Sequence, residues 1–229
     1  MTEKAFKITN KEKVLLFLYF GIGFFEIIAE YYNNTTFMYI LKPLLVPILA
    51  LLYWIKSKEK NSYFLFSLFF VLLANIFFIS KDFYSIVIAS VFLITYRGLI
   101  IYVVMKKVII NSFLPVFLGS IPFGALFIYL TFLTMNELGK GLYIYFVQVL
   151  FLSFLGGLSL SNYMIEESKK NFWLLVHVVL FALIQFILVL KLYYLSIIIF
   201  QPMSMAFYII AQFGIYKFML LSEEKSITE

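Results

Sequence analysis

Long apolar runs separated by short polar breaks fill this sequence, and their length is the first guide to the fold. Most runs contain roughly 20 residues, the length that an α-helix needs to cross a bilayer. Each run is continuously apolar, whereas the strands of an outer-membrane barrel alternate apolar and polar residues. Short breaks make sequence neighbours antiparallel. The eight predicted helices are Val14–Ala29, Phe37–Ile55, Tyr63–Ile79, Phe83–Met105, Phe113–Met135, Leu142–Met164, Phe172–Leu190 and Ile197–Leu221.

Composition sets the class of protein. The chain is 64% hydrophobic and 13% charged, with a mean hydropathy of +1.01. Soluble domains are about half apolar and about a quarter charged, so a fold of this length needs lipid to cover its apolar surface. We therefore expect an all-α integral membrane protein with one eight-helix domain over residues 1–229, flanked by tails at 1–13 and 222–229.

Residue types that are rare or absent narrow the chemistry. The chain has no cysteine and one histidine, His177. Disulfides, thiolate metal sites, a cysteine nucleophile and a multi-histidine metal centre are excluded. We therefore expect no metal and no cofactor. We also expect no nucleic-acid partner, because the net charge of +6 reflects membrane topology.

Lysines predict the orientation of the helices. Thirteen fall on one side of the predicted bundle and three on the other, while Lys42 and Arg97 lie within spans. By the positive-inside rule both termini are cytoplasmic. No cleavage site of small residues follows the first run, so we expect that helix to be retained. The thirteen are Lys4, Lys7, Lys11, Lys13, Lys56, Lys58, Lys60, Lys106, Lys107, Lys169, Lys170, Lys217 and Lys225; the three are Lys81, Lys140 and Lys191.

Polar residues inside spans are costly and need partners, which makes them candidates for a site. Lys42 lies about 8 Å into the second predicted helix, at 1.5 Å per residue. Glu26 lies at a similar depth in the first helix, so an ion pair between them is predicted, with Glu30 as the second candidate.

Other polar residues fall in the same outer half, and they predict a pocket if their helix faces converge. Arg97 and His177 are placed in the inner half, and Gln212 nearer the middle of its helix. Structural roles compete with this interpretation: amides can bridge helices, Arg97 and Lys42 can extend to the interface, and a lone histidine often only packs. The predicted pocket comprises Glu26, Lys42, Asn75, Gln148 and Gln185, and the predicted close-packing glycines are Gly21, Gly23, Gly156 and Gly157.

The stretch "YILKPLLVPILALL" resembles the lysine-proline segment of the lysoplasmalogenase family, the YhhN-like membrane proteins with eight helices. The end "FYIIAQFGIYKFML" is similar to that family's terminal stretch through Tyr208, Ala211 and Gln212. The family usually carries two acids, and here Asn75 and Gln185 stand at the best-matching positions. Placing the second acid at Asn162 instead would leave one helix too many before the terminal stretch.

The resemblance implies hydrolysis of the vinyl-ether bond of lysoplasmalogens. That reaction needs a proton donor, which a pair of carboxyls can supply and amides cannot. A non-catalytic lipid-binding protein is therefore the preferred function. A diverged hydrolase with Glu26 as its candidate catalytic acid is the alternative. A small transporter is the third, although no symmetric broken helices support it.

We expect membrane lipids as partners. The absence of cysteine and the short loops favour a bacterial inner membrane. The predicted lipid-binding residues are Lys42, Asn75, Gln148, Gln185, Tyr208 and Gln212.

Overall fold

A computed structural model describes residues 9–80, 82–108, 110, 112–195 and 197–225, with only the backbone described for residues 135–138, 140, 224 and 225. All eight predicted helices are confirmed, and the described residues contain no strand. A short 3₁₀ turn, η1, joins two of the helices. The helices are α1 (Asn10–Tyr31), α2 (Thr35–Lys56), α3 (Ser62–Phe77), α4 (Phe83–Lys107), α5 (Phe113–Leu138), α6 (Leu142–Ile165), α7 (Lys169–Tyr193) and α8 (Phe200–Lys225), and η1 is Gly139–Gly141.

Several helices begin before the apolar runs that predict them, because a polar side chain caps the first turn. Thr9 accepts a hydrogen bond from the backbone N–H of Glu12, so α1 begins at Asn10. Ser168 accepts one from Asn171, so α7 begins at Lys169. Such caps satisfy N–H groups that have no partner within the helix. The predicted tails 1–13 and 222–229 are therefore helical over residues 10–13 and 222–225, and the rest of them lies largely outside the described residues.

Seven of the described helices are long and apolar enough to cross a membrane. The eighth, α3, is apolar and has 16 residues, which gives it a length of about 24 Å at 1.5 Å per residue. The prediction of an integral membrane protein with an all-α fold is therefore confirmed.

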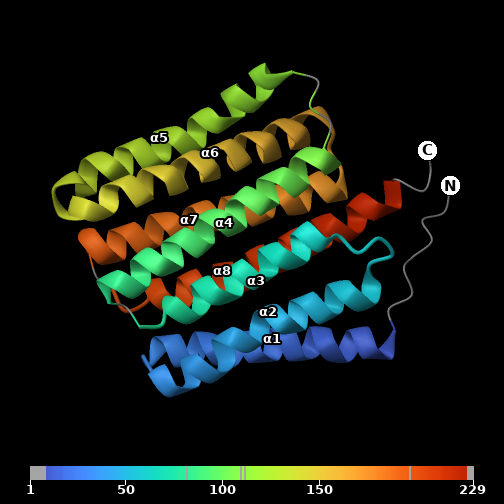
Figure 1. The fold of residues 1–229 in the computed structure, drawn as a ribbon, viewed down its shortest axis with the longest axis horizontal. Coiled ribbons are helices and arrows are strands. Elements are labelled where there is room, and N and C mark those ends of the chain that lie inside the picture. Colours follow the sequence, from blue (N-terminus) through green and yellow to red (C-terminus); the bar gives the residue numbers. More distant parts are fainter. Residues whose placement is uncertain (1–8, 81, 109, 111, 196, 226–229) are drawn as a thin grey trace.

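Six helices form a ring through their contacts with one another. The other two, α1 and α5, lie at the edges of the bundle (Figure 1). Around the ring each helix packs against the next, in the order α2, α3, α4, α6, α7, α8 and back to α2. Helix α1 packs on α2 and α8, and α5 packs on α6 and α7, so these two helices lie at opposite edges of the bundle. The interior of the ring is therefore the place where buried polar side chains from many helices can meet.

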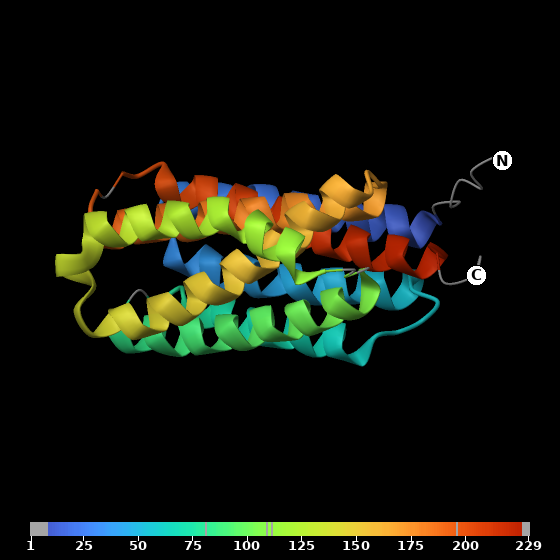
Figure 2. The ribbon, with the colours of Figure 1, turned by 90° about the horizontal axis from the view of Figure 1, so that it is seen from above.

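The beginning of α1 and the end of α8 lie at the same end of the bundle, as an even number of helices requires (Figure 2). At this end, side-chain contacts connect α1 with α2, and α8 with the segment that follows α2. Lys56 and Glu12 form an ion pair of 2.8 Å between α2 and α1. Glu223 of α8 accepts hydrogen bonds from the hydroxyl of Ser57, at 2.7 Å, and from the backbone N–H of Lys58, at 2.9 Å.

Which side of the membrane this end faces stays a prediction. Lys4, Lys7 and Lys81, on which that prediction partly rests, lie outside the described residues, and the side chains of Lys140 and Lys225 are not described either.

Three of the four predicted close-packing glycines are confirmed. A Cβ at Gly157 would overlap the hydroxyl of Ser120 and the backbone carbonyl of Val116 on α5. One at Gly156 would overlap a phenylalanine ring of α5, and one at Gly23 would lie 2.7 Å from Ile209. Gly21 was wrongly predicted, because no atom lies within 4 Å of the place where its Cβ would be.

Candidate functional site

A cavity of about 210 Å³ lies inside the bundle, at the end opposite the beginning of α1 and the end of α8. Helices α3, α4, α7 and α8 supply most of its wall, while α1 and α2 each contribute one charged residue. Much of the wall is aliphatic or aromatic. The polar lining residues are Glu30, Lys42, Asn75, Arg97, Gln185, Lys191, Gln201, Ser204 and Tyr208.

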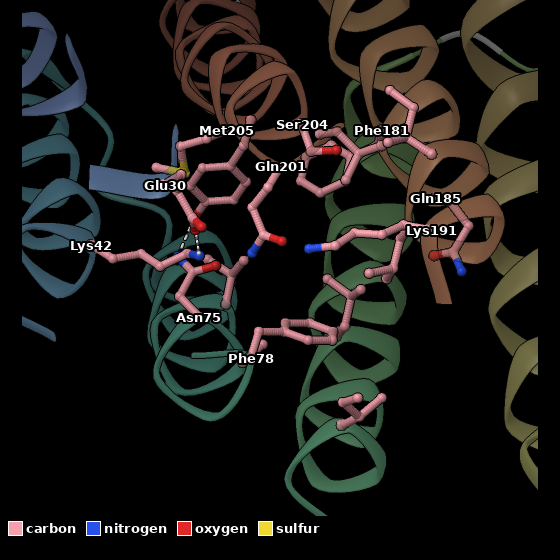
Figure 3. Close-up of a pocket in the computed structure, with 18 of the residues that line it drawn as sticks. Glu30, Lys42, Asn75, Phe78, Phe181, Gln185, Lys191, Gln201, Ser204 and Met205 are labelled. Atoms are coloured by element: carbon pink, nitrogen blue, oxygen red, sulfur yellow. Dashed lines mark hydrogen bonds and ion pairs between the residues drawn. The ribbon is translucent and has the colours of Figure 1, made fainter. Parts of the chain in front are cut away.

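Lys42 forms an ion pair with Glu30, with 2.6 Å between its Nζ and the Oε1 of the carboxylate (Figure 3). The Lys42 side chain is 11% exposed and that of Glu30 is 1% exposed. The predicted pairing of Lys42 with Glu26 is therefore wrong, and the second candidate is the partner.

The direction of helical side chains explains this outcome. A side chain on a helix leans toward the N-terminus of that helix. Lys42 therefore leans back toward the α1–α2 turn, and Glu30, near the end of α1, leans from that turn toward Lys42. Asn33, at a φ of 52°, makes the turn tight enough to bring both residues together. Equal depth along the two axes, which favoured Glu26, left out the direction of the side chains.

Glu26 lies apart from the cavity. It is fully buried, and neither of its carboxyl oxygens has a hydrogen-bond partner among the described residues. It lies within electrostatic range of Lys42 and Glu30 but is not part of the wall. Glu26 is therefore not in a position to touch a molecule in the cavity, and Glu30 is the carboxylate that lines it.

Asn75 and Tyr208 connect two helices of the cavity wall. The side-chain amide of Asn75 on α3 donates a hydrogen bond of 2.5 Å to the hydroxyl of Tyr208 on α8. One turn further along α8, the side-chain oxygen of Gln212 accepts a bond of 3.4 Å from the hydroxyl of Tyr96. Gln212 is buried behind the wall and does not line the cavity.

His177 packs in the core of the bundle. Its Nδ1 lies 2.8 Å from the backbone carbonyl of Ala211. A carbonyl oxygen only accepts, so Nδ1 carries the proton and donates. The ring is 1% exposed and lies against Phe181. These contacts agree with the structural role considered for this residue.

Arg97 lies in the wall of the cavity and not apart from it in the inner half. Its guanidinium donates to the backbone and side-chain oxygens of Gln148, at 3.2 and 3.4 Å, and to the side-chain oxygen of Gln185, at 3.0 Å. The residue is 2% exposed, so it does not extend to the interface. Its side chain leans toward the beginning of α4, which lies at the cavity end of the bundle, and this carries the guanidinium to the level of the two glutamines.

The predicted pocket residues thus fall into three groups. Lys42, Asn75, Gln185 and Tyr208 line the cavity. Gln148 and Gln212 stand behind it and accept hydrogen bonds from Arg97 and Tyr96. Glu26 makes no contact of this kind.

Sequence reasoning missed Lys191, Gln201 and Ser204, which also line the cavity. Lys191 was assigned to a loop, but it lies in the last turn of α7 and extends toward the cavity (Figure 3). Helical spacing could have revealed these residues. Gln201, Ser204 and Tyr208 follow one another at three and four residues, so they share a helix face. Lys191 follows the lining residue Leu188 at three.

The described residues contain no group of three histidine, aspartate or glutamate side chains placed to bind a metal. Glu26, Glu30 and Lys42 bring two carboxyls and one ammonium within electrostatic range of one another.

The fold and the cavity together define a polytopic α-helical membrane protein with a largely apolar cavity, lined in part by charged and amide side chains, within its helix bundle. Residues 37–219 match the family model of the YhhN family, and the chain belongs to that family. Comparisons with curated proteins and with solved structures gave no match. The matched residues include Lys42, Asn75, Gln185 and Tyr208, whereas Glu30 precedes them.

Proposed function

We propose that this protein binds a lysophospholipid-like lipid in the cavity and has lost the hydrolytic activity that its family resemblance implies. The observation that carries the proposal is the mixed wall. Apolar side chains of α3, α4, α7 and α8 suit an acyl chain, and charged and amide groups on the same wall suit a polar head group.

The loss of hydrolysis rests on Asn75 and Gln185. Both line the cavity at the positions where the resemblance places acids. Asn75 donates to Tyr208, and Gln185 accepts from Arg97. Neither amide has a titratable proton that it could transfer to the vinyl carbon of a lysoplasmalogen. Short loops and the absence of cysteine support a location in a bacterial inner membrane, with membrane lipids as the source of the ligand.

Binding is tested by thermal unfolding in a neutral maltoside detergent, with and without lysophosphatidylcholine. A ligand present at 100 times its dissociation constant stabilises the folded state by about 2.7 kcal/mol, which raises the melting temperature. Ser204→Phe fills the cavity and should remove this increase. Thr95→Phe, on α4 away from the cavity, is the control and should retain it. A melting temperature of wild-type protein that does not respond to lysolipid would contradict the proposal.

One observation favours retained hydrolysis as a second candidate. Glu30 lines the cavity, and its Oε2 has no hydrogen-bond partner among the described residues. A carboxyl in this position could take part in proton transfer to or from a bound lipid. Release of fatty aldehyde from lysoplasmalogen by purified protein, and its loss in Glu30→Gln, would establish this activity. The earlier candidate, Glu26, does not line the cavity, so Glu26→Gln should leave any such activity in place.

A further inference from the structure

Cations outnumber carboxylates among the described residues that line the cavity. Three cations line the cavity, Lys42, Arg97 and Lys191, against one carboxylate, that of Glu30. The carboxylate is engaged by Lys42 in the ion pair of 2.6 Å. Positive charge in a low-dielectric interior attracts an anion far more strongly than it would in water.

Arg97 is the cation that most needs a negative partner. It is 2% exposed, and its three hydrogen bonds all end on neutral oxygens of Gln148 and Gln185. No carboxylate of the described residues forms an ion pair with it, and its Nε has no hydrogen-bond partner. A buried charge is expensive unless an opposite charge compensates it, and neutral dipoles compensate only in part.

The chemistry of the guanidinium indicates what would complete the site. Its planar fork of N–H donors matches the oxygens of a phosphate or a carboxylate. Gln148 and Gln185 hold the fork from two helices, α6 and α7, and so fix its orientation beside the cavity. Lys42 and Lys191 extend into the same space from other directions (Figure 3).

We propose that the cavity prefers a single-chain lipid with a net negative head group, and that Arg97 is the residue that sets this preference. The inference rests on the proposed lipid binding and adds the charge of the ligand. A phosphate monoester and a carboxylate share the required chemistry, so both serve as probes. The head group lies beside Arg97, and the chain lies against the apolar side chains of α4 and α7.

The test compares four ligands with the same twelve-carbon chain: dodecyl phosphate, dodecanoate, dodecylphosphocholine and neutral monododecanoylglycerol. Affinities are measured for purified protein in nanodiscs made of a zwitterionic lipid. For at least one of the two anions, the dissociation constant of wild-type protein should be about tenfold lower than for the zwitterion or the neutral lipid. The stronger anion identifies the head group as phosphate or carboxylate.

Two variants examine Arg97 directly. Arg97→Met should remove the preference for anions and leave the affinity for the neutral lipid within about twofold. Gln185→Glu places a carboxylate where an oxygen already lies 3.0 Å from the guanidinium, so it should also remove the preference, and it does not require the fold to survive the loss of Arg97. Lys106→Gln is the control, because it removes a positive charge from the far end of the same helix, outside the cavity.

The possible outcomes separate this inference from the function on which it rests. Equal affinity of wild-type protein for all four ligands would overturn the anion preference and leave lipid binding in place. Binding of none of them would overturn both. A preference that survives in Gln185→Glu would show that Arg97 does not set it.

Discussion

The ion pair of Lys42 with Glu30 places two charges among apolar side chains at one end of the bundle. Such a pair is costly to break from one side, because the remaining charge stays buried without compensation. The two glutamates of α1 should therefore contribute differently to the stability of the protein. Glu30 forms the ion pair with Lys42, whereas the carboxyl oxygens of Glu26 have no hydrogen-bond partner among the described residues.

Replacing each glutamate by glutamine distinguishes them. Glu30→Gln should destabilise the protein by about 3–5 kcal/mol, since it leaves the ammonium of Lys42 unpaired. Glu26→Gln should cost less than about 1 kcal/mol, because no hydrogen bond is lost. The measurement is the midpoint of unfolding as sodium dodecyl sulfate is added to protein in mixed micelles.

A third variant supports the assignment. Glu30→Gln combined with Lys42→Met removes both charges and should recover much of the stability lost by Glu30→Gln alone. If Glu26→Gln is as destabilising as Glu30→Gln, the pairing described here is wrong.

Arg97 leads to a prediction of the opposite sign. Gln185→Glu keeps the size of the side chain and gives the guanidinium a carboxylate at the position of the present 3.0 Å bond. Charge on both partners strengthens a hydrogen bond, so the variant should be more stable by about 1–3 kcal/mol in the same unfolding measurement.

Gln212→Glu is the matched control for this change. Gln212 accepts a bond from Tyr96 and has no contact with Arg97, so the new carboxylate would be buried without a cation. It should destabilise the protein. Destabilisation by Gln185→Glu as well would show that the guanidinium does not lack a negative partner.

At the scale of helices, the contact of α5 with α6 depends on glycine. Gly157 allows the backbone of α6 to lie directly against Val116 and Ser120 of α5. Close approach through small residues is the usual way in which helices associate in lipid, where the hydrophobic effect contributes little.

Gly157→Ala should destabilise the protein by about 1–3 kcal/mol, because the added methyl group would overlap backbone atoms that cannot move aside without separating the helices. Gly124→Ala on α5 is the control. Nothing lies within 4 Å of its Cβ position, so alanine there should be neutral or stabilising by roughly 0.5–1 kcal/mol. Equal effects of the two substitutions on the unfolding midpoint would contradict the close contact.

Helices could be predicted from the sequence because their signal is local. An apolar run of bilayer length such as Phe113–Met135 has few other stable forms in lipid. Contacts between helices depend on the rotation of each helix about its axis, which no single run reveals. The pairing of Lys42 and the position of Arg97 were wrong for a different reason, because depth along the axis leaves out the lean of each side chain toward the N-terminus of its helix. Gly21 and Gly157 look alike in sequence, yet only Gly157 faces a neighbour.

For the whole molecule, the ring explains why one cavity can collect residues from six helices. Residues as distant in sequence as Glu30 and Tyr208 meet because α1 packs on α2 and α8 while α3, α4 and α7 close the other sides. Much of this candidate site could be predicted as polar residues at a common depth. Lys191 and Gln201 were missed, since they lie near helix ends where polar residues ordinarily face water, although their spacing from other lining residues places them on the same helix faces.

The orientation of this ring decides from which leaflet a lipid would enter. Described lysines crowd the end where α1 begins and α8 ends, whereas Lys191 lies at the cavity end. The positive-inside rule then predicts that the cavity lies in the outer half of the membrane. The lysines that crowd the first end are Lys11, Lys13, Lys56, Lys58, Lys60, Lys106, Lys107, Lys169, Lys170 and Lys217.

Reporter fusions in a bacterial host test this orientation. Green fluorescent protein should fluoresce when fused to either terminus, and alkaline phosphatase should be inactive there, because it matures only outside the cytoplasm. The same phosphatase inserted after Asn33, in the α1–α2 turn, should be active and serves as the positive control. Active phosphatase at both termini would reverse the orientation and put the cavity in the inner leaflet. A single-chain lipid from the cytoplasmic leaflet would then be the ligand to test first.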